Sequence, residues 1–287
     1  MLVSVAKLLR QAREEGYALG AFNTANLETS RAIFEAAAEL RSPVILQMTE
    51  KTFEYAGGRA MYFLVKQLGD FYFADIPFGI HLDHGRNLSV VREALAIGFK
   101  SVMMDASTLD YATNLEATKM IVHEAHAKGA EVQAELGNVP YTSEIPDPTS
   151  LDWSQYMTNP QQVQEFVEGT GTDVLAIAIG NAHGAFPERP EPDYERLEHI
   201  RKLVEVPLVM HGASDWDEER VTKVIERGVS CFNVDTATRT AFVAALQETL
   251  REHPEEKDIR KVLRPAKEAF REAVKQKMLL FRSSHKI

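Results

Sequence analysis

The sequence predicts an α/β fold, a (β/α)8 barrel of the TIM type, and three observations lead to this prediction. Short apolar runs alternate eight times with amphipathic helical patterns over the 287 residues. Polar side chains follow almost every run, which is where such a barrel places its active site. The first run is not followed by a Gly-rich phosphate loop, and this disfavours the alternative of an open doubly wound sheet.

The predicted strands are apolar segments bounded by glycine, proline or polar residues, as buried parallel strands usually are. They cover residues 17–22, 44–48, 78–84, 101–104, 131–134, 173–179, 207–210 and 229–234. The predicted helices have apolar residues at helical spacing, and several stop at a glycine. They cover residues 2–15, 28–40, 55–68, 88–97, 111–128, 160–168, 194–204, 218–228, 237–251 and 265–281. No linker or repeat divides the chain, so we expect one barrel domain over residues 1–287 with a C-terminal helical extension.

The composition disfavours several classes of partner. A formal net charge of −10 argues against nucleic acid or an anionic membrane. No apolar stretch approaches the roughly 20 residues of a membrane span, and charged residues interrupt the N-terminus too early for a signal peptide. The single cysteine, Cys231, lies within an apolar run and is interpreted as a packed core thiol rather than a nucleophile. A chain without an internal disulfide fits a reducing compartment, and we expect a cytoplasmic protein.

Polar, metal-capable side chains stand at the C-terminal ends of the predicted strands. The densest group is the stretch 79–85, in which His81, Asp83 and His84 precede Gly85. Such a strand end is costly as mere core, because buried charge must be paired or bound to something. Across the strands the group comprises Asn23, Asp83, His84, Asp105, Glu135, His183, His211, Asn233 and Asp235. We expect these side chains to share one mouth of the barrel.

Three histidines of this group, His84, His183 and His211, follow three different strands. Three neutral imidazoles with an open fourth position are typical of a catalytic zinc site. Asp105 and Glu135 could orient these histidines or hold the metal in an alternative position. The remaining six histidines are interpreted as structural or surface residues. A metal held in this way could also activate water, so a metal-dependent hydrolase is an alternative function.

The alternation of side chains along a strand does not by itself determine where the His84 side chain points. Residues two apart on a strand share a face, so His81 and Asp83 point the same way while His84 points away. Asp83 and His84 can therefore serve one site only if the strand ends at His84, which Gly85 permits.

The loops after the last two predicted strands have the character of a phosphate site. Gly212, Ala213 and Ser214 follow the seventh strand, and residues 233–236 lead from the eighth into a helix. Barrel enzymes commonly bind phosphate there, with backbone N–H groups and a helix N-terminus supplying the field. The alternative is that Ser214 and Thr236 act only as helix caps.

Residues 137–159 break the alternation of strands and helices. This segment has no hydrophobic periodicity, contains three prolines and leaves the mouth immediately after Glu135. Long irregular segments in compact domains are usually functional. We interpret it as a lid, with a passive surface loop as the alternative.

Seven runs, AFNTANLET, HLDHG, SVMMDAS, EAHAKGAEVQAELG, AIAIGNAHG, PLVMHGAS and NVDTATR, occur in this order from residue 21 to residue 239. Together they strongly resemble the class II, zinc-dependent fructose-bisphosphate and tagatose-bisphosphate aldolases. The resemblance implies a (β/α)8 barrel, a homodimer or homotetramer, and reversible cleavage of a ketose bisphosphate to dihydroxyacetone phosphate and glyceraldehyde 3-phosphate. It favours fructose 1,6-bisphosphate as substrate, with tagatose bisphosphate as the alternative. A catalytically silent sugar-phosphate binder is a third possibility.

The resemblance also implies roles for individual residues. His84, His183 and His211 fall on the zinc ligands, with Co²⁺ as a replacement, and Asp105 and Glu135 fall on carboxylates near the metal. Asp83 falls on the acid/base residue. A monovalent cation is a further expected ligand. The positions implied to contact substrate are Asn23, Gly184, Gly212, Ala213, Ser214, Asn233, Val234, Asp235, Thr236, Arg239 and Arg260, the last from a neighbouring subunit.

The chemistry of the resemblance agrees with the residues present. Zinc would stabilise the enediolate left by cleavage as a Lewis acid, and Asp83 would take the proton of the carbon-four hydroxyl. A Schiff-base mechanism needs a lysine at the C-terminal end of a strand, and Lys100 instead precedes its strand.

Two positions depart from the family pattern. The lid reads VPYTSE over residues 139–144 instead of a Gly-Gly-x-Glu-Asp-like sequence, so Glu144 is only a candidate for the acid that reprotonates the enediolate. Asp215 stands where a glycine commonly follows the serine, and a carboxylate near a phosphate is unfavourable unless it turns away.

Overall fold

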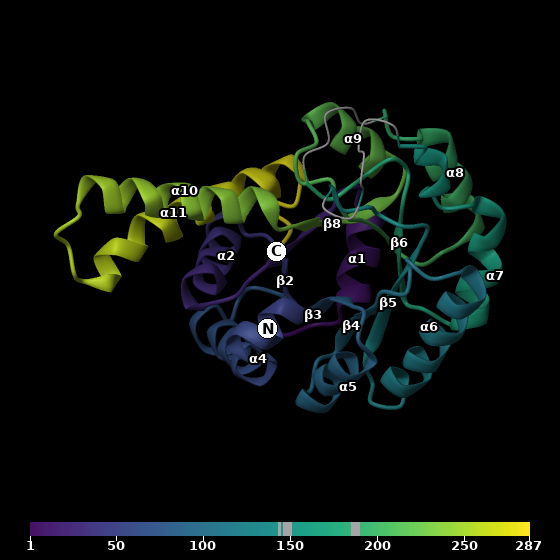
Figure 1. Cartoon of the computed structure of the whole chain (residues 1–287), viewed down its shortest axis with the longest axis horizontal. Helices are drawn as coiled ribbons and strands as arrows, with labels where there is room; N and C mark the ends of the chain where they lie inside the picture. The colour runs from purple at the N-terminus through teal and green to yellow at the C-terminus, as the bar shows by residue number, and fades with distance from the viewer. Residues whose placement is uncertain (143–144, 146–150, 185–189) are drawn as a thin grey trace.

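The computed structural model describes residues 1–142, 145, 151–184 and 190–287. Eight parallel strands pair in sequence order, and β1 pairs with β8 to close the barrel (Figure 1). The strands are β1 (Leu19–Asn23), β2 (Val44–Thr49), β3 (Phe78–Gly85), β4 (Ser101–Met104), β5 (Glu131–Leu136), β6 (Val174–Ile177), β7 (Leu208–Met210) and β8 (Val229–Val234). This architecture confirms the predicted (β/α)8 barrel.

Helices alternate with the strands and surround the barrel (Figure 1). They are α1 (Val5–Glu14), α2 (Leu27–Leu40), α3 (Glu50–Ala56), α4 (Gly58–Gln67), α5 (Leu88–Ile97), α6 (Tyr111–His126), α7 (Pro160–Thr170), α8 (Tyr194–Leu203), α9 (Glu218–Glu226), α10 (Thr236–Glu252) and α11 (Ile259–Leu280), with short turns η1 (Leu68–Tyr72) and η3 (Trp153–Gln155). Among the described residues no helix is both long and apolar enough to cross a membrane.

The core has two parts because each strand alternates its side chains between two faces. Outward-facing residues such as Ile80 and Leu82 of β3 pack against the surrounding helices. Other strand residues, Cys231 among them, form a second cluster, to which α1 contributes Leu8 and Leu9. Cys231 is buried, and burial raises the pKa of its thiol, so the structure agrees with a packed core thiol.

Most predicted helices differ from the structure by a few residues at their ends, and two differ by more. The expected helix 55–68 is two helices, α3 and α4, separated by Gly57 in a left-handed conformation with φ +80°. The last helix begins at Ile259 rather than at Pro265, because the Asp258 side chain caps it by accepting the N–H of Arg260. The predicted start at Pro265 was therefore too late.

The helices α10 and α11 pack against each other, and α11 also packs against α2; the two helices together project from the barrel as an arm (Figure 1). We name this pair the C-terminal arm. Its first helix begins directly after β8, at the mouth of the barrel.

Candidate active site

The end of β3 resolves the uncertain direction of His84. The pairing of β3 with β4 shifts register between Leu82 and Gly85, and His84 adopts φ +49°. This left-handed conformation is rare for a residue with a side chain and is often found at functional sites. The strand does not end at His84, contrary to the condition set by alternation. The bulge instead turns the His84 imidazole into the mouth beside Asp83.

The glycine that follows is required by packing. A Cβ atom at Gly85 would lie 2.4 Å from the carbonyl oxygen of Met103 and 2.6 Å from Cγ2 of Val91. No other residue fits this position without displacing backbone. Gly85 therefore allows β3 to return to β4 after the irregularity at His84.

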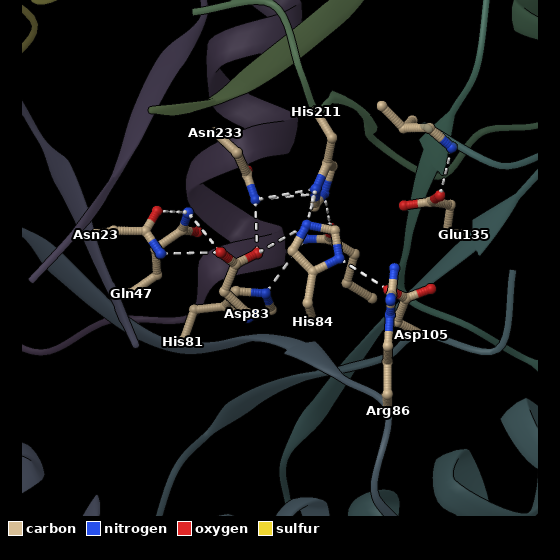
Figure 2. A network of polar contacts seen from close by, with 12 residues as sticks. Asn23, Gln47, His81, Asp83, His84, Arg86, Asp105, Glu135, His211 and Asn233 are labelled. Atoms are coloured by element: carbon tan, nitrogen blue, oxygen red, sulfur yellow. Dashed lines mark hydrogen bonds and ion pairs between the residues drawn. The ribbon is translucent and has the colours of Figure 1, made fainter. Parts of the chain in front are cut away.

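Three predicted metal ligands come together at the mouth. The His84 ring centre lies 5.1 Å from that of His183 and 4.6 Å from that of His211. One nitrogen from each ring falls within 4.8 Å of the other two. Figure 2 shows His84 and His211 facing each other, with Asp83 on one side of the His84 ring and Asp105 on the other.

Hydrogen bonds determine which nitrogen each ring presents. His84 Nδ1 donates to Asp105 Oδ2 over 2.8 Å, so Nε2 is the nitrogen that faces His211. His211 Nε2 donates to Gln133 Oε1 over 2.8 Å, so its Nδ1 faces His84. The two inward nitrogens are 2.9 Å apart. Two nitrogen lone pairs at this separation repel unless a proton or a cation lies between them.

This donor set fits a divalent metal ion. Tetrahedral zinc with Zn–N bonds of about 2.0 to 2.1 Å places its nitrogen ligands about 3.3 Å apart, close to the observed separation. A second group, His84, Asp105 and Glu135, also brings its ligand atoms within 4.8 Å. Glu135 Oε1 accepts the N–H of Val139, whereas its buried Oε2 is without a hydrogen bond among the described residues. Both predicted metal positions therefore have three ligand atoms that lie close to one another.

The charges around the histidines favour a cation. Burial lowers the pKa of His84, but the charges of Asp83 and Asp105 outweigh it and raise this pKa to about 9. The pKa of Asp105 is held well below its usual range despite burial, because it binds His84 and lies beside Arg86. Burial and the charge of Asp105 raise the pKa of Glu135 to about 7. Burial lowers the pKa of His211, so its imidazole is neutral and suited to ligation.

Metal binding is expected to depend on pH, because the proton of His84 must leave before Nε2 can bind an ion. With that pKa raised to about 9, metal affinity should rise about tenfold per pH unit from neutral pH and level off above the pKa. Calorimetric titration with Zn²⁺ at pH 8, in buffers of different ionisation enthalpy, should show about one proton released per ion. An affinity that does not change with pH would contradict a protonated His84 in the metal-free protein.

Asp83 is held by amide side chains from three strands. Asn23 and Gln47 donate to its Oδ2 over 3.0 and 3.2 Å, and Asn233 donates to Oδ1 over 2.9 Å (Figure 2). Its Oδ1 lies 3.8 Å from His84 Nε2. These neutral donors satisfy a buried carboxylate without neutralising it. The arrangement orients a proton acceptor directly beside the histidine cluster.

The sequence interpretation missed the glutamines that organise this site. Gln47 contacts both Asn23 and Asp83, and Gln133 contacts His211. Each is a buried polar residue within an apolar strand, which was the signal available in the sequence. Gln133 Nε2 also approaches His81 Nε2 at 3.4 Å. His81 lies below the site, and burial lowers its pKa to about 4, in agreement with its interpretation as structural.

The loop after β7 packs closely against the backbone of the connection that follows β6. Gly212 has φ +61°, and a Cβ atom there would lie 2.4 Å from the carbonyl carbon of Ala182. Ser214 does not cap α9, because Asp217 does so; its hydroxyl lies 3.3 Å from the carbonyl oxygen of Asn233. The structure thus disfavours the capping alternative for Ser214. Asp215 is exposed.

The loop after β8 leaves the start of α10 open. Asp235 is the N-cap but makes no side-chain capping hydrogen bond among the described residues, and Thr236 is the first helical residue. Asp235 instead pairs with Arg239 over 3.1 Å. Free N–H groups at a helix start attract anions. Ala213 and Val234 are buried beside these loops.

Arg260 is the predicted substrate contact that lies away from the mouth. Arg260 lies in the first turn of α11, at the end of the C-terminal arm far from the barrel (Figure 1), and its side chain is 84% exposed. The fold does not bring it to the mouth of its own chain. Glu144 lies outside the described residues.

The start of the predicted lid lies across the mouth. Val139 N–H donates to Glu135 and Thr142 N–H donates to the carbonyl oxygen of His183 over 3.1 Å. Gly184 has φ +87°, and a Cβ atom there would lie 2.6 Å from Thr142 Oγ1. The described part of this segment therefore contacts the candidate site.

Comparison with known proteins supports one family. Residues 3–286 match the family model for class II fructose-bisphosphate aldolase. A fructose-bisphosphate aldolase of Thermus caldophilus is 43% identical across 99% of each chain. The YdjI aldolase of Escherichia coli K12 superposes with a TM-score of 0.84 at 30% identity, over 100% of this chain and 99% of that one. A Coccidioides immitis structure assigned as a fructose-1,6-biphosphate aldolase gives 0.86 at 32% identity, over 98% and 97%. The chain therefore belongs to the class II fructose-bisphosphate aldolases, a family of metal-dependent carbon–carbon lyases.

Proposed function

We propose that this protein is a zinc-dependent aldolase that reversibly cleaves fructose 1,6-bisphosphate to dihydroxyacetone phosphate and glyceraldehyde 3-phosphate. The observation that carries the proposal is the meeting of His84, His183 and His211 beside Asp83 at the mouth of the barrel. The match to the class II family over residues 3–286 supports the reaction type. A tagatose-bisphosphate enzyme is the alternative within the same fold.

The side chains at the mouth have distinct tasks in this proposal. The three imidazoles would hold zinc, which would supply a Lewis acid for the negative charge that develops on the substrate during cleavage. Asp83 takes the proton from the carbon-four hydroxyl, because it is an oriented carboxylate at the site. Asp105 and Gln133 fix the tautomers of His84 and His211. Glu135 and Asp105 provide an alternative metal position.

The phosphate of the dihydroxyacetone half binds between the loops after β7 and β8 in this proposal. The open N-terminus of α10 and the backbone of Gly212 and Ser214 support this placement, since N–H groups at a helix start bind anions. The remaining proposed substrate contacts are Asn23, Gly184, Ala213, Asn233, Val234, Asp235, Thr236 and Arg239. A monovalent cation is proposed to accompany the phosphate.

The protein is proposed to act as a homodimer or homotetramer. Arg260 can reach the second phosphate only from a neighbouring subunit, because it sits at the far end of the C-terminal arm. The surface of α10 carries Thr240, Val243, Ala244 and Gln247 at helical spacing, and Val243 is 44% exposed. This strip provides a surface for a second subunit. We propose that residues 1–287 form one barrel domain with this arm, in a cytoplasmic enzyme.

A coupled assay distinguishes the substrates directly. Glyceraldehyde 3-phosphate and dihydroxyacetone phosphate should form from fructose 1,6-bisphosphate faster than from tagatose 1,6-bisphosphate. This order is expected because Asp235 and Arg239, which form an ion pair here, match the residues of fructose-bisphosphate enzymes. Tagatose enzymes tend to have alanine at the position of Asp235. Release of inorganic phosphate without carbon–carbon cleavage would instead indicate the hydrolase. Binding without any turnover would indicate the silent sugar-phosphate binder.

A further inference from the structure

The segment after β5 forms hydrogen bonds with the backbone of His183, a proposed metal ligand. His183 N–H donates to the carbonyl oxygen of Pro140 over 2.8 Å, and Thr142 Oγ1 donates to the carbonyl oxygen of His183 over 2.9 Å. Tyr141 and His183 thus face each other in an isolated parallel β-bridge. This pairing fixes where the Tyr141 side chain enters the mouth.

The ring of Tyr141 covers the His183 imidazole. Their ring centres lie 4.0 Å apart and their planes differ by 8°, which is a close parallel stack. The same tyrosine ring lies 6.0 Å from the His84 ring, and the Arg86 guanidinium carbon lies 5.6 Å from its centre. Arg86 Nε in turn donates to Asp105 Oδ2. Tyr141 therefore stacks on His183 and, through Arg86, is linked to Asp105, which orients His84.

The three proposed ligands are held by different means. A carboxylate orients His84, and the amide of Gln133 orients His211. His183 lies beyond the end of β6, in the connection to α8, so no strand sets its direction. The Tyr141 ring lies parallel to the His183 imidazole and restricts the plane of that ring. Ligand orientation matters because the nitrogen lone pair must point at the ion.

We propose that Tyr141 is a positioning residue for metal binding, which fixes the plane of the His183 ring by stacking on it. The proposal rests on the proposed function, in that His183 must be a metal ligand. An imidazole bound to a divalent cation becomes electron-poor, whereas the face of a phenol ring is electron-rich. The stack is therefore stronger in the metal-bound protein than in the metal-free protein. Tyr141 stabilises the bound state by that difference.

Two substitutions distinguish the effect of the aromatic ring face from the effects of side-chain bulk and of the hydroxyl. Tyr141→Leu keeps an apolar side chain but removes the π face, and Tyr141→Phe keeps the ring but removes the hydroxyl. The metal-stripped proteins are titrated with Zn²⁺ against a competing chelator, and with Co²⁺ while the visible absorption of the ion is recorded. Tyr141→Leu should weaken zinc binding about tenfold, within the range for residues that orient metal ligands, and should alter the Co²⁺ spectrum. Tyr141→Phe should match the native protein in both measurements.

The melting temperature of the metal-free proteins provides the control for folding. Tyr141 is half-buried and outside the barrel strands, so all variants should melt with the native chain before metal is added. Native zinc affinity and a native Co²⁺ spectrum in Tyr141→Leu would overturn the proposal. An equal loss in Tyr141→Phe would also overturn it, because the ring would not be the cause.

His183→Ala distinguishes this failure from failure of the proposed function. Loss of metal by His183→Ala together with native binding by Tyr141→Leu would refute the stacking role alone. Full metal binding by His183→Ala would refute both, since His183 would then not be a ligand.

Discussion

Replacing His84, His183 or His211 by alanine is expected to remove the bound metal and, with it, cleavage of the ketose bisphosphate. Each ring provides one of three nitrogens that converge within 4.8 Å, and two imidazoles alone hold a divalent ion weakly. Removal of a residue that only orients a ligand typically costs 10–100-fold in metal affinity or activity. Loss of a direct ligand should therefore exceed about 100-fold.

The matched controls are Asp105→Ala and Glu135→Ala. Asp105 orients His84 through its Nδ1, and these two variants should show the milder loss of about 10–100-fold. Metal content after dialysis and turnover before and after chelation provide the measurements, with Zn²⁺ or Co²⁺ added back. Stoichiometric zinc retained by all three histidine variants would contradict the ligand assignment.

Chelation should abolish cleavage in the native protein, whereas borohydride in the presence of substrate should not. The lysine considered for a Schiff base, Lys100, precedes β4 and its Nζ donates to the carbonyl oxygen of Lys128 over 2.8 Å. It therefore lies at the barrel end opposite to the histidine cluster. Full activity after exhaustive chelation would refute the metal-dependent mechanism.

Replacing Asp83 by alanine is expected to lower turnover about 10² to 10⁴-fold, the usual effect of removing a general base. Asp83 accepts hydrogen bonds from Asn23, Gln47 and Asn233 and lies 3.8 Å from His84 Nε2. Asp83 contributes none of the three converging nitrogens, so the Asp83→Ala variant should keep zinc and bind substrate. Asp83→Asn, which keeps the shape but cannot accept the proton, should lose turnover to a similar extent.

Proton exchange at carbon three of dihydroxyacetone phosphate provides the sharper measurement, because it needs no carbon-four hydroxyl. If Asp83 acts only in bond cleavage, both variants should retain more exchange than cleavage. An equal fall in the rates of exchange and of cleavage would mean that Asp83 also acts on the enediolate. Glu144 would then no longer be needed as a candidate acid. Unchanged rates of both would show that Asp83 is structural.

The fold was predictable because its signals are local. A buried parallel strand needs a short apolar run, and a surface helix needs an apolar face, so the eight alternations identified the barrel. Closure of that barrel then required the strand ends to meet at one mouth. This is why Asp83, Asp105, Glu135 and the three histidines could be grouped from sequence positions alone. The start of α11 was placed less well: the prediction began the helix at Pro265, which lies inside it, because the capping residue Asp258 was not recognised.

The partners and directions of these side chains depended on contacts between distant segments. Gln133 and His211 are 78 positions apart, and only the register of neighbouring strands brings them together. His84 enters the mouth because β3 shifts its pairing with β4, whereas strand alternation alone sends it outward. Tyr141 meets His183 through a bridge between two irregular segments, for which no periodicity exists. The sequence by itself determined the barrel and the set of groups at its mouth, since these follow from hydrophobic pattern and strand order. The tertiary structure decided which atoms face each other, because register, bulges and loop pairing are set by packing across the whole chain.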